Sequence, residues 1–124
     1  MLSSGVDIIE ISRVRRVLES YGQRFLDRVY TSGEIAYCRG RAANLAARFA
    51  AKEATMKALG TGVRGVGWKD IEVVRQESGA PAIELHGRGE SRAQRLGVLQ
   101  IALSISHSRE YAVAVVVAQL GLEP

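Results

Sequence analysis

Two acidic residues and a lysine have the types and spacing best suited to binding a metal ion or taking part in catalysis. Asp7 lies in the mostly apolar segment Val6–Ile11. A carboxylate buried there needs a cation, a metal or a cluster of donors, because an unpaired buried charge is very costly. The alternative is that Asp7 ends a strand and caps the helix that follows.

Glu53 and Lys57 stand four residues apart and so share one face of a predicted helix. One interpretation is a surface ion pair that contributes about 0.3–0.5 kcal/mol. The other is that Glu53 faces a sheet edge beside Asp7. Two carboxylates together with substrate phosphates are a common way to hold Mg²⁺, and Lys57 could then neutralise a phosphate.

Three further features have both a functional and a structural interpretation. Ser106–Ser108 falls at a predicted hairpin tip, and its serines lack the G-x-S-x-G pattern of a hydrolase nucleophile, so His107 by itself reads as a turn residue. The glycine-rich run 60–67 matches neither dinucleotide-binding nor P-loop patterns and is expected to end a helix. Arginines gathered near the front form either a solvated face or a docking face for an acidic partner: Arg13, Arg15, Arg16, Arg24 and Arg28.

The first half of the chain is expected to place these residues on one strand and several helices. Segment 6–11 is rich in β-branched residues and predicts a strand, and the spacing of apolar residues predicts a helix over 11–21. A short helix is expected over 24–28, and Thr31 with Glu34 matches a capping box that begins another. Ala42–Leu59 predicts the longest helix, with alanines along one flank and Gly60 as its stop.

The second half predicts strands joined by hairpins. Segments 70–76 and 82–86 flank a turn at Ser78–Pro81, a short helix is expected over 90–96, and segments 99–106 and 111–118 flank His107–Glu110. The small residues Ala102, Ser104 and Ser106 are expected to face the alanine-rich helix. The sequence therefore predicts a single α+β domain over residues 1–124, with a mostly antiparallel sheet packed against the long alanine-rich helix.

Composition limits the classes of protein. The 124 residues are 47% hydrophobic and 24% charged, which excludes wholesale disorder, and they carry a net charge of +4. The one cysteine, Cys38, excludes an intrachain disulfide. There is no signal-peptide pattern, and the longest uncharged apolar run, 111–122, is shorter than the ~20 residues of a membrane helix. We expect a cytoplasmic protein without a membrane partner.

Three segments occur in a specific order: GVDIIEISR over 5–13, RFAAKEATMKALGTG over 48–62 and SISHS over 104–108. Together they resemble the holo-acyl-carrier-protein synthase family, the small 4'-phosphopantetheinyl transferases, and the resemblance covers nearly the whole chain. Its most specific part is Lys52-Glu53-x-x-x-Lys57 paired with the early Gly-x-Asp.

The resemblance implies a homotrimer with active sites between subunits. It implies Mg²⁺-dependent transfer of 4'-phosphopantetheine from coenzyme A to a serine of apo-acyl carrier protein, in fatty acid biosynthesis, with release of adenosine 3',5'-bisphosphate. Asp7 and Glu53 match the metal ligands and Lys57 the phosphate-contacting lysine, and Glu53 is our first choice for the base that takes the serine proton. The resemblance also implies a coenzyme A pocket and a carrier-protein surface, matched respectively by Arg48, Gly60, Pro81, His107 and Ser108, and by Arg13 and Arg24.

Two other functions stay open on the sequence alone. A non-catalytic basic binding module is one, although the aromatic content of 6% is low and the arginines are scattered, which does not favour nucleic acid. A catalytically silent scaffold homologue is the other, and the presence of Asp7, Glu53 and Lys57 argues against it.

Overall fold

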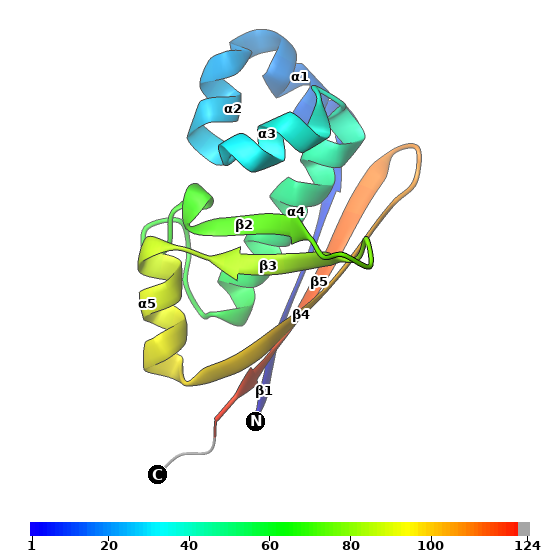
Figure 1. Cartoon of the computed structure of the whole chain (residues 1–124). Coiled ribbons are helices and arrows are strands. Elements are labelled where there is room, and N and C mark those ends of the chain that lie inside the picture. Colours follow the sequence, from blue (N-terminus) through cyan, green and yellow to red (C-terminus); the bar gives the residue numbers. More distant parts are fainter. Residues whose placement is uncertain (122–124) are drawn as a thin grey trace.

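The computed structural model describes residues 1–121 (Figure 1). In chain order the elements are β1 (Leu2–Glu10), α1 (Ile11–Tyr21), α2 (Gln23–Val29), α3 (Ser32–Cys38), α4 (Ala42–Ala58), the short 3₁₀ turn η1 (Trp68–Asp70), β2 (Ile71–Arg75), β3 (Pro81–Leu85), α5 (Gly87–Leu96), β4 (Val98–His107) and β5 (Tyr111–Leu120). The fold class predicted from the sequence, α+β with antiparallel strands and a long alanine-rich helix, is confirmed. No helix among these residues is both long and apolar enough to span a bilayer.

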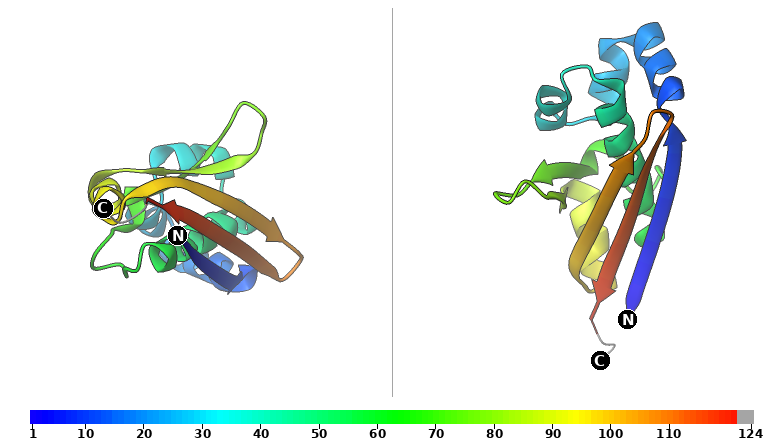
Figure 2. Two further views of the ribbon diagram at one scale, coloured as in Figure 1. Left: turned by 90° about the horizontal axis from the view of Figure 1, so that it is seen from below. Right: turned by 90° about the vertical axis from the view of Figure 1, so that its right-hand side faces the viewer.

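The strands form two separate antiparallel sheets. β1, β5 and β4 lie side by side in that order, although β1 and β5 are at opposite ends of the sequence, and β2 pairs with β3 as a two-stranded ribbon (Figure 2). In the larger sheet, Asp7 stands opposite Ala114, which in turn stands opposite Ile105. This order places the N-terminal strand at an edge of the sheet.

Helix α4 packs its alanines against one face of the three-stranded sheet. Ala50, Ala51, Ala54 and Ala58 share a core with Ala114 and Val116 of β5. The expected orientation of β4 is wrong: Ile101, Leu103 and Ile105 face this core, while Ala102, Ser104 and Ser106 are exposed. The alanines of α4 and β5 already permit close approach, and turning the larger β4 side chains inward removes more apolar surface from water.

Gly5 is the point of closest approach between β1 and α4. A Cβ built on Gly5 would lie 2.0 Å from the carbonyl oxygen of Ala54 and 2.9 Å from the Cβ of Lys57. No side chain fits there, so the glycine lets the strand lie directly on the helix backbone. This contact fixes Asp7, two residues along the strand, beside the last turns of α4.

A buried ion pair joins α4 to the elements on its other side. Lys52 and Glu34 are both almost fully buried, with Nζ 2.8 Å from Oε1. Lys52 also donates to the carbonyls of Trp68 and Ile71, and the other oxygen of Glu34 accepts from the backbone N–H of Val73 at 2.8 Å. All three ammonium hydrogens of Lys52 therefore have acceptors, which makes the residue structural.

Local signals in the sequence located the helix ends well. Thr31 and Glu34 form the predicted capping box, and Gly22 and Gly60 have positive φ values of 54° and 71° just past α1 and α4. The first strand is longer than predicted, beginning at Leu2 because it pairs with β5 along its whole length.

Within residues 1–121, no layer of helices covers the other face of the three-stranded sheet (Figure 2). Large apolar side chains on it are exposed, among them Ile8 at 63%, Val6 at 54% and Val115 at 41%. These residues alternate with the buried ones along β1 and β5, as expected for a sheet that is covered on one side only.

Candidate active site

Asp7 and Lys57 are brought together by the contact between β1 and α4. Lys57 Nζ lies 3.3 Å from Asp7 Oδ1 and donates to the Val6 carbonyl at 2.8 Å. Asp7 lies within β1 and no side chain caps α1, so it is not a helix cap. Lys57 pairs with Asp7, and no ion pair to Glu53 forms among the described residues.

Glu53 and Asp7 line the same cavity, which has a volume of about 410 Å³. Burial raises the pKa of Glu53, and the negative charge of Asp7 raises it further. The positive charges of Lys57 and Arg13 lower it and only partly offset these effects. The cavity thus holds two carboxylates, and the nearby cations offset only in part the effects that raise the pKa of Glu53.

The rest of the cavity is built by apolar side chains of β1, α1, α2 and α4. Phe49 lies one turn before Glu53 and stacks on Trp68, with ring centroids 4.9 Å apart. Val14, Val17 and Phe25 complete the wall, and Arg13 stands at the same cavity. Carboxylate oxygens beside positive charge in a half-buried cleft suit a divalent cation and a phosphate-bearing substrate.

Three arginines converge on the ring of Tyr37. The guanidinium carbons of Arg48, Arg75 and Arg41 lie 4.5, 5.1 and 5.9 Å from its centroid. Arg48 is only 4% exposed, and Arg75 donates to the Tyr37 hydroxyl. Within residues 1–121 none of these arginines has a carboxylate partner. The cluster is therefore a concentration of positive charge that no carboxylate of the described residues pairs with.

The remaining predicted site residues lie around these two regions. Gly60 follows α4, and Pro81 opens β3 directly opposite Arg75. His107 and Ser108 lie at the exposed tip of the β4–β5 hairpin, outside the cavity of Asp7 and Glu53. Arg24 lines a neighbouring groove between α1 and α2, together with Val17, Tyr21 and Phe25.

Sequence reasoning missed part of this arrangement. Tyr37, Arg41 and Arg75 were not singled out, because the ring and the guanidinium groups come from α3, the α3–α4 turn and β2 and meet only in the fold. No local spacing signals such a contact.

Comparisons with known proteins agree with this geometry. Residues 3–116 match the model of the 4'-phosphopantetheinyl transferase superfamily. Holo-[acyl-carrier-protein] synthase of Gloeobacter violaceus is 55% identical to this chain over 116 residues, which cover 90% of this chain and 88% of that protein. The synthase of Koribacter versatilis is 47% identical over 123 residues, which cover 96% of this chain and 98% of that protein. The Helicobacter pylori synthase, solved in complex with coenzyme A, superposes with a TM-score of 0.86 at 31% identity, covering 94% of this chain and 99% of that one.

The protein is therefore an α+β transferase in which two carboxylates meet where an edge strand contacts a long helix. Within this class, the chain belongs to the holo-[acyl-carrier-protein] synthase family of 4'-phosphopantetheinyl transferases.

Proposed function

We propose that this enzyme transfers 4'-phosphopantetheine from coenzyme A to a serine of apo-acyl carrier protein. The observation that carries the proposal is the meeting of Asp7 and Glu53, 46 positions apart in the sequence, in one cavity beside Lys57. Relatives named as synthases of holo-acyl carrier protein, and the coenzyme A complex of the Helicobacter pylori synthase, support the substrates. Fatty acid biosynthesis and a cytoplasmic location stay predictions from the sequence.

Asp7 and Glu53 fit a Mg²⁺ site. They are two hard oxygen donors in one cleft, and the charge of Asp7 raises the pKa of Glu53, which Lys57 and Arg13 offset only in part. When bound, Mg²⁺ supplies positive charge that stabilises the diphosphate as negative charge builds on it.

The reaction transfers one group, and side chains of this protein assist it. The serine oxygen forms a bond to the β-phosphorus of coenzyme A, the pyrophosphate P–O bond breaks, and adenosine 3',5'-bisphosphate leaves. Lys57 places a cation at the cavity, where it offsets charge on the phosphate oxygens. We assign Glu53 as the acceptor of the serine proton, because its carboxylate lines the same cavity as Asp7, where the diphosphate would be held.

The arginine cluster around Tyr37 is proposed to hold the anionic adenosine end of coenzyme A. Arg48 is almost fully buried against the ring, so its charge is held in place before the ligand binds. Pro81 begins β3 directly opposite Arg75 of the cluster, which is consistent with a role for Pro81 in the same pocket.

We propose that the groove of α1 and α2 is part of the docking surface for the carrier protein. It combines Arg24 and Arg28 with the apolar side chains Val17, Tyr21 and Phe25, which suits an acidic helix with an apolar residue. Arg13 also borders the cavity of Glu53, so Arg24 is the cleaner probe of docking.

Arg24→Glu is expected to raise the KM for the carrier at least tenfold and to change the KM for coenzyme A less than twofold. Charge reversal at a docking rim slows encounter with an acidic partner without touching the nucleotide. Steady-state kinetics at two salt concentrations measure this, with Arg95→Glu on the distant helix α5 as the control. Equal changes in both KM values would remove Arg24 from the docking surface.

We propose that the exposed sheet face joins three copies of the chain. Val6, Ile8 and Val115 form part of an apolar surface that water would otherwise cover, and a contact between copies would bury it. His107 and Ser108 lie at an exposed hairpin tip away from the cavity of their own chain, which is consistent with a role in a neighbouring site.

Val115→Lys is expected to convert the trimer to a monomer, because a lysine at the centre of this face would be buried without a partner. Light scattering coupled to gel filtration gives the mass directly, and Gln94→Lys on α5 is the control. A trimer that persists in the Val115 variant would show that another surface makes the assembly.

The function itself is tested by incubating the protein with coenzyme A, Mg²⁺ and apo-carrier protein. We expect the intact mass of the carrier to rise by one phosphopantetheine group, and a carrier whose acceptor serine is replaced by alanine to stay unmodified. A carrier that stays unmodified while an active control synthase converts it would end the proposal.

A further inference from the structure

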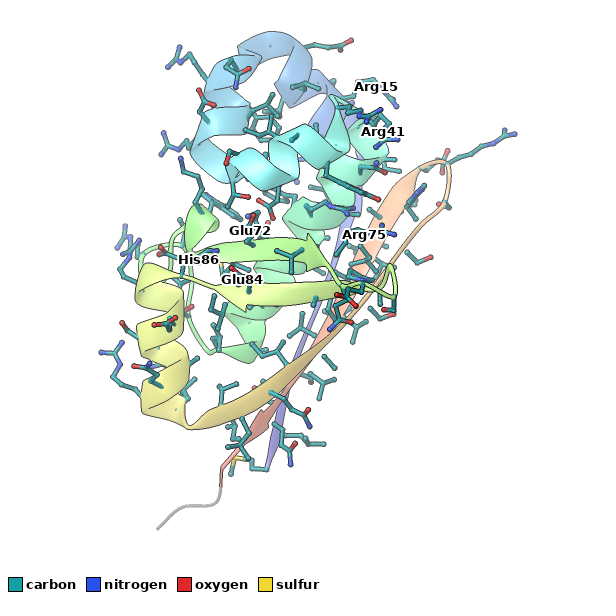
Figure 3. The ribbon with its side chains drawn as sticks, viewed as in Figure 1. Arg15, Arg41, Glu72, Arg75, Glu84 and His86 are labelled. Atoms are coloured by element: carbon teal, nitrogen blue, oxygen red, sulfur yellow. The ribbon has the colours of Figure 1, made fainter. Side chains whose placement is uncertain are left out.

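We propose that Glu72, Glu84 and His86 form a second metal site, distinct from the Asp7–Glu53 cavity, that takes a first-row transition-metal ion such as Zn²⁺. One ligand atom from each residue lies within 4.8 Å of the other two. The three side chains gather at the end of the β2–β3 ribbon nearest α5, and Arg75 lies at the opposite end (Figure 3).

The donor set is mixed, with one imidazole nitrogen and two carboxylate oxygens. This combination suits zinc and its neighbours, whereas Mg²⁺ prefers oxygen alone. His86 Nε2 lies 2.9 Å from Glu72 Oε1 and 3.7 Å from Glu84 Oε1. Two ligands about 2.0–2.1 Å from a tetrahedral zinc ion lie ~3.3 Å from each other, so small side-chain rotations would suffice.

The strand register sets two carboxylates side by side in the cluster. Glu72 and Glu84 stand directly opposite each other on β2 and β3, an arrangement that destabilises a sheet when both residues are charged alike. His86 donates at most one N–H from Nε2, and within residues 1–121 neither Lys nor Arg pairs with either glutamate. The buried Lys52 directs its three hydrogens at Glu34 and at the carbonyls of Trp68 and Ile71.

Glu72 is also held in place from outside the cluster. The Thr31 hydroxyl donates to Glu72 Oε2 at 2.7 Å, which leaves Oε1 directed at His86. An outer hydrogen bond that orients a carboxylate is the usual support of a metal ligand.

Ligand exposure allows an ion to enter from solvent. The side chains of His86 and Glu84 are 40% and 58% exposed, while Glu72 at 18% forms the floor. Three protein ligands leave a fourth tetrahedral position open for water. To bind the ion, Nε2 of His86 presents its lone pair in place of its contact with Glu72, and any proton on Nε2 passes to solvent.

The test is a calorimetric titration with Zn²⁺. The protein is first freed of bound metal and then placed in excess Mg²⁺, which is intended to keep the Asp7–Glu53 cavity occupied. We expect one equivalent of Zn²⁺ per chain and a rise in melting temperature, because an ion bound only to the folded state stabilises it. His86→Gln and Glu84→Gln should each weaken Zn²⁺ binding at least tenfold and remove the rise in melting temperature.

Two matched controls separate this site from general surface binding. His107→Gln removes the other histidine of the chain, and Glu77→Gln removes an exposed carboxylate of the same ribbon; both should bind Zn²⁺ as the parent does. Equal zinc affinity in the parent and the His86 variant, with both folded by circular dichroism, would show that the three side chains form an ion-pair cluster only.

Discussion

Asp7→Asn is expected to reduce phosphopantetheine transfer by roughly a thousandfold or more while the protein stays folded. The change keeps the size of the side chain but removes one anionic ligand of the proposed Mg²⁺ site, and a metal ion contributes several kcal/mol of transition-state stabilisation. Since about 1.4 kcal/mol corresponds to a factor of ten in rate, losing most of that contribution gives a change of this size. Turnover of coenzyme A with the carrier protein measures it.

Glu53→Gln is expected to behave in the same way, because the two carboxylates line one cavity. Glu10→Gln is a suitable control: Glu10 is an exposed carboxylate at the end of the same strand as Asp7. If the Asp7 and Glu53 variants both kept near-normal rates, the proposed metal ligands would be wrong even if the transferase assignment held.

Gly5→Ala is expected to destabilise the protein by about 3 kcal/mol or more, at the upper end for an overpacked core. The added methyl group would lie 2.0 Å from a backbone oxygen of α4, and neither the strand nor the helix can move there without disturbing the core between them. Activity should fall as well, since Asp7 is carried by the same strand. Melting temperature at fixed protein concentration, together with turnover, gives both effects.

Gly62→Ala is the matched control, because a Cβ at Gly62 has no neighbour within 4 Å and its φ lies outside the left-handed range. The melting temperature of the Gly62 variant should be close to that of the parent protein. A Gly5 variant as stable as the Gly62 variant would mean that β1 and α4 do not lie as close as the structure places them.

Much of the fold follows from local patterns in the sequence. The capping box at Thr31, the alanine flank of α4 and the glycine after it are short-range signals, and the structure confirms the elements they predict. The predicted orientation of β4 was wrong, because alternation with a period of two shows which residues share a face of the strand but not which face is buried. That choice depends on the helix and strand opposite.

The candidate site was predicted only in part, for a related reason. The sequence suggested that Asp7 and Glu53 could meet, and the structure does place them in one cavity. One of the two interpretations of the sequence was an ion pair between Glu53 and Lys57, whereas Lys57 lies against Asp7 because β1 passes beside it. Lys52 and the arginines around Tyr37 depend on contacts between distant segments, and no spacing along the chain reports those.

The central claim is that Asp7 and Glu53 jointly bind one divalent cation, and a crystal grown with Mn²⁺ and coenzyme A tests it most directly. Anomalous scattering should give one peak roughly 2 Å from an oxygen of each carboxylate. A peak bound to only one of them, or no peak in this cavity when coenzyme A is bound, would contradict the account.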